Sequence, residues 1–468
     1  MTRVSLGIDL GTSGVKTVLL DEAGTAVGGA SRSYPVAATR PGWAETDPAL
    51  WEQAARDAVG ETLAAAPGAE VLSVGLDGQM HGTVLVDDAG AAVRPAVLWP
   101  DARAADQLPR WRALPDALRV ALGNPLTAGM PGPVLGWLAE HEPETLARAD
   151  SFVLPKDWLR SRLVPGTPCT DGSDASATLL WDVSADAWAV EAAERVGVPV
   201  RLLPPLRAAD ETAGTVGSAV AAEWGLPAGI PVSIGCGDVA ATLLGLGAEA
   251  HRTVLTVGTG AQLVLPGVRP EPADPVRHQL YRDAEDGWFA MGAVMNGGLA
   301  LGRVIELLGA DWDDLYRSYD TTAALPGFLP WFAGERLPEG IEAGTAGWFD
   351  VGLGTTRADL LASALEGVAF TVRRALEAMP PSAEVVDLVG GGTRSPVFNQ
   401  LLADVLHRPL RRLGQRDATV LGAARLGWRT AGRDPEPPPG GSTELVEPRT
   451  SEHLDARYAR FLRHPAAP

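Results

Sequence analysis

The sequence predicts an α/β protein with two large domains, and three observations lead to this prediction. Short apolar runs typical of strands alternate with segments of helical periodicity, as in α/β domains. A strand, a Gly-rich turn and a second strand occur near the N-terminus and again after residue 250. The length of 468 residues suggests two or three domains, and two large ones would suffice.

The first half begins with a predicted β-hairpin. Residues 4–9 and 15–20 are apolar strands on either side of Gly11-Thr12-Ser13-Gly14, and a third strand is expected over 26–33. Residues 48–65 have helical spacing, and Asp47 is a good N-cap before Pro48. Further strands are predicted over 71–76 and 83–86, so strands and helices alternate.

The second half repeats this pattern. A strand at 231–234 precedes a helix at 238–246, and strands at 253–257 and 262–264 flank Gly258-Thr259-Gly260. A long amphipathic helix covers 360–376, and a strand at 385–389 leads through Gly390-Gly391-Gly392-Thr393 to a helix capped by Ser395. We therefore expect an N-terminal domain over 1–248, a C-terminal domain over 249–432 and a mobile, Pro/Gly-rich tail over 433–468.

Composition excludes several classes of protein. The formal net charge of -19 argues against nucleic-acid binding, which relies on clustered Lys and Arg. No run reaches the roughly 18 apolar residues of a membrane span. We therefore expect a soluble protein. Cys169 and Cys236 fit neither a metal motif nor a disulfide framework, so we expect it to be cytoplasmic. The oligomeric state stays open, with a homodimer as one alternative.

The three Gly-rich turns indicate a nucleotide site. Glycine lets the backbone approach an anion closely, and Thr and Ser hydroxyls add donors. A single turn of this kind is more often only a tight turn, but three in one chain, two of them in matching hairpins, favour a phosphate cradle. Neither the P-loop pattern nor the dinucleotide-binding pattern is present, so the cradle is of another type.

Three charged residues lie where such a cradle could use them. Asp9 ends the first strand and could hold a Mg²⁺ ion that bridges phosphates, or could merely fix its own turn. Lys16 could neutralise a transferring phosphoryl group, or could be a solvated strand lysine. Asp238 follows a strand and precedes an Ala-rich helix, so it could cap that helix, act as a general base, or do both.

A further polar loop, Asp77-Gly78-Gln79-Met80-His81-Gly82, follows the strand at 71–76. Ligand sites of α/β proteins gather at strand ends, and side chains of this type suit the recognition of hydroxyl groups. The seven histidines show no zinc-ligand spacing, and no nucleophile elbow is present.

Taken in order, these segments resemble the FGGY family of carbohydrate kinases over residues 1 to about 430. The Gln79-Met80-His81 and Ser173-Asp174-Ala175-Ser176 segments favour the members that act on xylulose. The other matching stretches are Gly7-Ile8-Asp9-Leu10-Gly11-Thr12-Ser13-Gly14-Val15-Lys16, Pro41-Gly42-Trp43-Ala44-Glu45, Leu154-Pro155-Lys156-Asp157, Gly237-Asp238 and Gly390-Gly391-Gly392-Thr393.

The resemblance implies two actin-like, ribonuclease-H-like domains with an ATP and sugar cleft between them. It implies that Asp238 is the catalytic base and contacts the sugar together with Met80, His81 and Trp99. It also implies ATP and Mg²⁺, with Asp9 as the metal ligand. The residues expected to face the metal, the phosphates or the rest of the nucleotide are Asp9, Gly11, Thr12, Ser13, Lys16, Gly258, Thr259, Gly298, Gly391, Gly392 and Thr393.

The expected reaction is phosphorylation of a ketopentose primary hydroxyl, with D-xylulose as the first candidate sugar. Three departures from the family pattern bear on the sugar: Asp77 stands where Ser is usual, Pro100 where Asn is usual, and Val239 where Asn usually follows the base. Ribulose, gluconate and glycerol are therefore alternatives. From other classes, an actin-like ATPase would use the same phosphate turns but gives no reason for Gln79-Met80-His81 and the Asp238 loop. A non-catalytic sugar sensor would need a lost base or metal ligand, yet Asp9 and Asp238 are both present.

Overall fold

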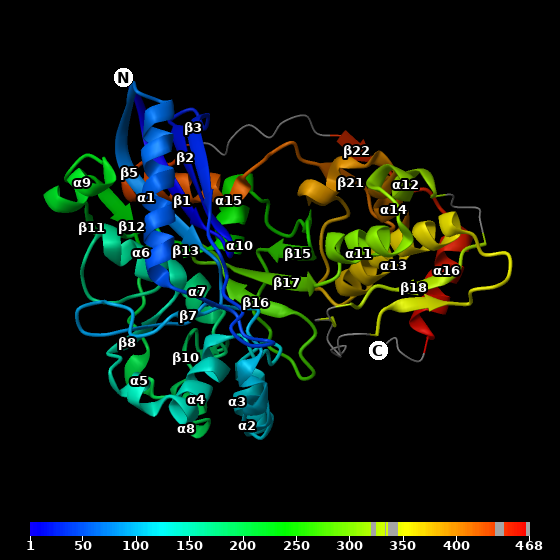
Figure 1. Cartoon of the computed structure of the whole chain (residues 1–468), viewed down its shortest axis with the longest axis horizontal. Helices are drawn as coiled ribbons and strands as arrows, with labels where there is room; N and C mark the ends of the chain where they lie inside the picture. Colours follow the sequence, from blue (N-terminus) through cyan, green and yellow to red (C-terminus); the bar gives the residue numbers. More distant parts are fainter. Residues whose placement is uncertain (320–323, 333, 336–344, 436–443, 465–468) are drawn as a thin grey trace.

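The computed structural model describes residues 1–319, 324–332, 334–335, 345–435 and 444–464. Two seven-stranded mixed sheets organise the chain into two lobes (Figure 1). The first sheet has the order β11-β12-β5-β1-β2-β3, and β13 pairs with β5. Its strands are β1 (Thr2–Leu10), β2 (Gly14–Asp21), β3 (Ala26–Ser33), β5 (Ala69–Gly78), β11 (Thr212–Thr215), β12 (Pro231–Ser233) and β13 (Cys236–Gly237).

The second sheet has the order β16-β17-β15-β14-β20-β21-β22. In both sheets an antiparallel hairpin, β1-β2 or β14-β15, continues into parallel partners on one side, and an antiparallel strand closes that edge. The strands are β14 (Val254–Val257), β15 (Ala261–Pro266), β16 (Gln279–Arg282), β17 (Trp288–Val294), β20 (Val386–Val389), β21 (Leu410–Arg412) and β22 (Glu444–Val446). The two-domain α/β prediction is confirmed.

Helices cover both sheets, and their ends follow local sequence signals. Asp47 caps α1 and Ser395 caps α14, each with Pro in the first turn, as predicted. The principal helices are α1 (Pro48–Ala65), α4 (Pro131–His141), α6 (Pro155–Leu163), α7 (Gly172–Ser176), α10 (Asp238–Leu246), α11 (Gly298–Leu308), α13 (Arg357–Glu377), α14 (Pro396–Leu406), α15 (Ala418–Thr430) and α16 (Glu452–Leu462).

Helix α15 crosses back to the first lobe, although its sequence lies within the predicted C-terminal domain. It packs on β1, β5 and α10, and Figure 1 shows it, in orange, beside them. A Cβ atom on Gly75 would lie 1.8 Å from the Ala423 carbonyl oxygen, so the strand and the helix approach more closely than side chains allow. The first lobe therefore contains chain from both halves of the sequence.

The predicted mobile tail is wrong for residues 444–464. Strand β22 closes the edge of the second sheet, in the position that β11 has in the first. Helix α16 buries Leu454, Tyr458 and Phe461 in the second hydrophobic core. Arg457 of α16 forms a buried pair of hydrogen bonds with Glu366 of α13, at 2.9 and 2.7 Å. Residues 436–443 and 465–468 of the predicted tail lie outside the described residues.

The described helices include none with the length and apolarity that a bilayer crossing needs.

Candidate active site

Three strand ends bring three carboxylates together. Asp9 and Asp77 are direct partners on the parallel strands β1 and β5, and β13 pairs with β5 so that Gly237 lies opposite Gly78. Asp238 follows Gly237 and is the first residue of α10. Gly237 occupies the cap position, so Asp238 is not the N-cap; its Oδ1 instead accepts a hydrogen bond from the Val239 amide at 2.8 Å.

Burial raises the pKa values of all three carboxylates. Burial raises the pKa of Asp9 to about 6, which the neighbouring Asp77 and Lys16 partly offset. Burial and the charge of Asp9 raise the pKa of Asp238 to about 7. Asp77 is fully buried, and burial and the charges of Asp9 and Asp238 raise its pKa well above the usual range. The cluster therefore favours a proton or a cation.

Lys16 lies next to Asp9 across the β1-β2 hairpin. Its Nζ donates to Asp417 Oδ1 at 2.8 Å, and about half of each side chain is exposed. Asp417 directly precedes α15 with a left-handed φ of 57°. An exposed ion pair of this kind contributes only about 0–1 kcal/mol, so a bound anion could replace Asp417 at the lysine.

The predicted sugar residues surround the same loop. Met80 is buried against the backbone of Gly237, and a Cβ atom there would lie 3.0 Å from Met80 Cγ. His81 is buried, and its Nδ1 lies 2.6 Å from the Ala177 carbonyl oxygen. Trp99 donates from Nε1 to Thr12 Oγ1 at 2.9 Å, which joins the predicted sugar side to the first phosphate turn. Pro100 is exposed.

The predicted nucleotide residues of the second lobe lie on two turns and at the start of α11. The turn at Gly258-Thr259-Gly260 joins β14 to β15, and Gly298 at the start of α11 donates to the Gly258 carbonyl oxygen at 2.9 Å. Gly390 has a φ of 100°, which favours glycine, and Thr393 Oγ1 donates back to its carbonyl oxygen at 2.8 Å. A Cβ atom on Gly392 would lie 2.5 Å from Val257 Cγ1, so this turn packs against the end of β14.

A cavity of about 710 Å³ lies between the lobes, and Met80, His81 and Trp99 are not part of its lining. Of the predicted residues, it is lined by Asp9, Gly11, Lys16, Asp238, Gly391 and Thr393. The other predicted nucleotide residues are not part of its lining: Thr12, Ser13, Gly258, Thr259, Gly298 and Gly392 lie on adjoining turns or at the start of α11.

The cavity also contains polar residues that the sequence analysis missed. The segment from Arg412 to Thr419, which links β21 to α15, lines one wall and includes Gln415 and Asp417. The only sequence signal was Asp417 directly before a helical stretch, and this pattern is more typical of an N-cap. The segment reaches Asp9 and Lys16 only because α15, which follows it, packs on the first lobe. Local sequence spacing could therefore not reveal its place at the site.

The carboxylates suit a magnesium ion that is shared with phosphates. The buried carboxylate of Asp77 lies against that of Asp9, and Asp9 lines the cavity. Within the described ranges no group of three His, Cys, Asp or Glu residues could enclose a metal ion. Mg²⁺ usually takes only one or two protein carboxylates and completes its shell with water and phosphate oxygens, so Asp9 fits this role.

Two models of the FGGY family of carbohydrate kinases match the chain, the N-terminal domain over residues 4–245 and the C-terminal domain over residues 253–431. The xylulose kinase of Escherichia coli is 32% identical, with 97% of this chain and 96% of that protein covered. The xylulose kinase of Streptomyces coelicolor is 33% identical, over 90% of this chain and 86% of that protein.

Solved structures agree with this likeness. A xyloylose kinase from Brucella ovis superposes with a TM-score of 0.90 at 32% identity, covering 98% of each chain. A gluconate kinase from Lactobacillus acidophilus has a TM-score of 0.89 at 20% identity, over 99% of this chain and 96% of that one, and shows that the fold is shared.

Proposed function

The chain belongs to the FGGY family of carbohydrate kinases, and we propose that it transfers the γ-phosphoryl group of Mg-ATP to a primary hydroxyl of D-xylulose, giving D-xylulose 5-phosphate. The observation that carries the proposal is the position of Asp238, which lines the cavity between the lobes beside Asp9 and the buried loop of Met80 and His81. The identity of the sugar is supported by the xylulose kinases that match along nearly the whole chain.

In this proposal Asp238 is the general base. A base works best when its pKa lies near the working pH, and burial together with Asp9 raises the pKa of Asp238 to about 7. Asp238 Oδ1 accepts from the Val239 amide, which fixes the carboxylate at the start of α10. The carboxylate would take the proton of the sugar hydroxyl as the oxygen–phosphorus bond forms and the bond to the leaving ADP breaks.

The remaining residues align and neutralise the phosphates. Phosphoryl transfer requires positioning and charge compensation more than covalent chemistry. Gly11, Gly391 and Thr393 line the cavity, and Lys16 can exchange its exposed partner Asp417 for a phosphate oxygen. Asp9 would hold Mg²⁺, which supplies neutralising charge to the phosphates when it is bound.

Met80, His81 and Trp99 would form the sugar side of the site. The loop of Met80 packs on the residue before the base, so a sugar held there would lie next to Asp238. Buried Cys169 and Cys236 are free thiols, which suits a reaction in the cytoplasm, where ATP is supplied. The homodimer remains a prediction, and sedimentation analysis can test it.

ADP release measured across D-xylulose, D-ribulose, gluconate and glycerol tests the proposal. We expect the highest kcat/KM with D-xylulose and a loss of at least about 100-fold in kcat for Asp238→Asn, because a general base contributes about 10²–10⁴-fold. Nucleotide affinity should change by only a few-fold, which controls for misfolding. A better kcat/KM for gluconate or glycerol would overturn the sugar, and a kcat above about a tenth of the parent value would overturn the base.

A further inference from the structure

A buried charge cluster lies under the loop that carries Asp238. Lys156, the second residue of α6, is fully buried, and its Nζ lies 2.7 Å from Asp157 Oδ1, 3.0 Å from Asp171 Oδ1 and 3.1 Å from Asp174 Oδ2. Burial opposes the charge of Lys156, but the three aspartates outweigh it and raise the pKa of the lysine. A buried charge of this kind is costly unless it is paired on several sides, so the cluster has a fixed geometry.

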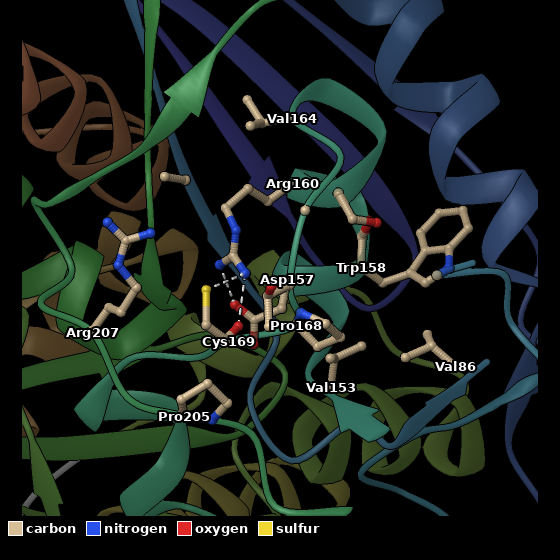
Figure 2. A pocket seen from close by; sticks show the side chains of 15 residues that line it. Val86, Val153, Asp157, Trp158, Arg160, Val164, Pro168, Cys169, Pro205 and Arg207 are labelled. Atoms are coloured by element: carbon tan, nitrogen blue, oxygen red, sulfur yellow. Dashed lines mark hydrogen bonds and ion pairs between the residues drawn. The ribbon is translucent and has the colours of Figure 1, made fainter. Parts of the chain in front are cut away.

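The cluster is anchored on its outer side by Arg160. Its guanidinium donates to Asp157 Oδ1 at 2.6 Å and to the carbonyl oxygens of Ile234 and Cys169 at 2.8 and 2.7 Å. Figure 2 shows this arrangement, with Arg160 directed at Asp157 and Cys169. One of these partners, Ile234, lies four residues before Asp238. The arginine therefore ties α6 to the beginning of the loop.

A chain of hydrogen bonds leads from the lysine to the residue before Asp238. Asp171 pairs with Lys156 through Oδ1, and its Oδ2 accepts from the Ser173 hydroxyl at 2.5 Å and from the Ser173 amide at 2.8 Å. The Ser173 hydroxyl in turn accepts from the Gly237 amide at 2.8 Å. Because Ser173 donates its only hydroxyl proton to Asp171, its lone pair is directed to Gly237.

The loop has little freedom to move around this contact. Gly235 has a φ of 90°, and a Cβ atom there would lie 3.1 Å from Lys156 Cδ. At Gly237 a Cβ atom would lie 3.0 Å from Met80 Cγ and 3.4 Å from Asp174 Oδ1. Asp238 directs its carboxylate by accepting from its own neighbour Val239, so the carboxylate moves with the backbone of the loop.

We propose that Ser173, held by Asp171 and Lys156, is a positioning residue that fixes the backbone of Gly237 and thereby the carboxylate of Asp238. This inference rests on the proposed function, in which Asp238 is the base. Ser173 does not itself line the cavity, and its hydroxyl bonds Asp171 and Gly237. Small displacements of a reacting group are costly in enzymes, so the relay would matter chiefly for kcat.

Two serines of the same helix provide a matched test. Ser173 and Ser176 are both fully buried on α7, and each hydroxyl accepts one hydrogen bond from a distant backbone amide, Gly237 for Ser173 and Arg282 for Ser176, at 2.8 and 2.9 Å. Ser173→Ala should lower the Tm more than Ser176→Ala, because it also loses the hydrogen bond to the Asp171 carboxylate. A purely structural role would nevertheless leave the kcat of both folded variants unchanged.

We expect Ser173→Ala to lower kcat by about 10- to 100-fold with the KM for ATP unchanged within about twofold. Amide hydrogen exchange should accelerate at residues 236–239 in this variant. Ser176→Ala should keep kcat within about twofold and leave exchange at 236–239 unchanged. Equal kcat for the two variants, or unaltered exchange at 236–239 in Ser173→Ala, would overturn the inference.

Asp238→Asn, measured in parallel, separates this inference from the proposed function. If Asp238→Asn retains its activity, the base assignment fails. Faster exchange at 236–239 together with a lower kcat in Ser173→Ala would still show that the relay positions this loop for the reaction. If Asp238→Asn is inactive and Ser173→Ala matches Ser176→Ala, the base stands and the positioning role of Ser173 is wrong.

Discussion

Asp238 makes the rate sensitive to pH in a predictable direction. A general base acts in its ionised form, and the pKa of Asp238 is raised to about 7 by burial and by the charge of Asp9. We expect kcat/KM for the sugar to fall about tenfold per pH unit below that pKa and to level off above it. Initial rates at saturating Mg-ATP between pH 5.5 and 8.5 check this. A profile that is flat from 6 to 8 would contradict the assignment.

Asp77 should reduce stability at neutral and alkaline pH. Burial and the nearby Asp9 and Asp238 raise its folded-state pKa well above the unfolded value, so the folded state keeps the proton to higher pH. The stability of the folded state therefore falls as the pH rises above the unfolded pKa of about 4. Asp77→Ser, which restores the residue usual in the family, should raise the Tm by several degrees at pH 8 and by less than about 1 °C at pH 4.

Thermal unfolding without added metal measures this difference, and Asp87→Ser, in an exposed turn of the same lobe, is a useful comparison. Asp87 accepts from the Ala89 and Ala91 amides, so its removal should lower the Tm instead. A Tm for Asp77→Ser that falls at pH 8 would show that the buried carboxylate is compensated by a partner.

Site residues could be predicted from the sequence where they lie at or just after the end of an apolar strand. Asp9 and Asp238 each follow an apolar strand, and His81 lies in the loop after another, so their meeting at one sheet edge follows from the topology. Asp417 could not be recognised, because its contact with Lys16 joins positions 401 residues apart. Ser173 appeared only as part of a family motif, and its bond to Gly237 depends on the packing of α7.

The contact between β5 and α15 is a very close packing between elements of the two halves. Gly75→Ala would place a methyl group 1.8 Å from the Ala423 carbonyl oxygen and 2.5 Å from the Gly427 amide, so the helix must move. Overpacking of this kind typically costs about 1–3 kcal/mol, occasionally more, and we expect a Tm lower by several degrees. Because β5 continues from Gly75 to Asp77 and Gly78 at the site, kcat should fall too.

Gly60→Ala is the matched control for this substitution. Gly60 lies within α1, is exposed, and would have no atom within 4 Å of its new Cβ. Replacing glycine by alanine inside a helix stabilises by about 0.5–1 kcal/mol, so this variant should melt at a higher temperature. Differential scanning calorimetry distinguishes the two, and a Gly75→Ala protein as stable as its parent would show that α15 adapts without cost.

Elements with strong local signals were predictable, and those defined by distant partners were not. The two hairpins, the capped α1 and α14 and the long α13 follow from turn residues, caps and periodicity. The segment over 444–464 looked like a tail because Pro and Gly dominate the residues before it. Its order comes from pairing with β21 and from the buried Arg457–Glu366 contact, which no local pattern reveals.

At the scale of the whole molecule, the position of the phosphate turns predicts closure. Gly11 belongs to the first lobe and Gly391 to the second, and both line the same cavity of about 710 Å³. Holding one triphosphate with both turns should draw the lobes together and keep water from the phosphoryl group. Small-angle scattering should give a smaller radius of gyration with D-xylulose and a non-hydrolysable ATP analogue than without them. An unchanged radius would argue against closure.

The crossing of α15 also constrains how the protein can be made. Multidomain chains generally fold from the N-terminus as the ribosome releases them, at about 5–20 residues per second. Helix α15 covers the face of the first sheet that bears Gly7 and Gly75. This helix comes roughly 170 residues after α10 in the chain. The ribosome needs about 10 to 30 s to synthesise the residues between α10 and α15, and during this time the face is not covered by α15. The first lobe must therefore wait, incomplete, until the chain is nearly finished, and this interval is when a nascent molecule most needs chaperone protection.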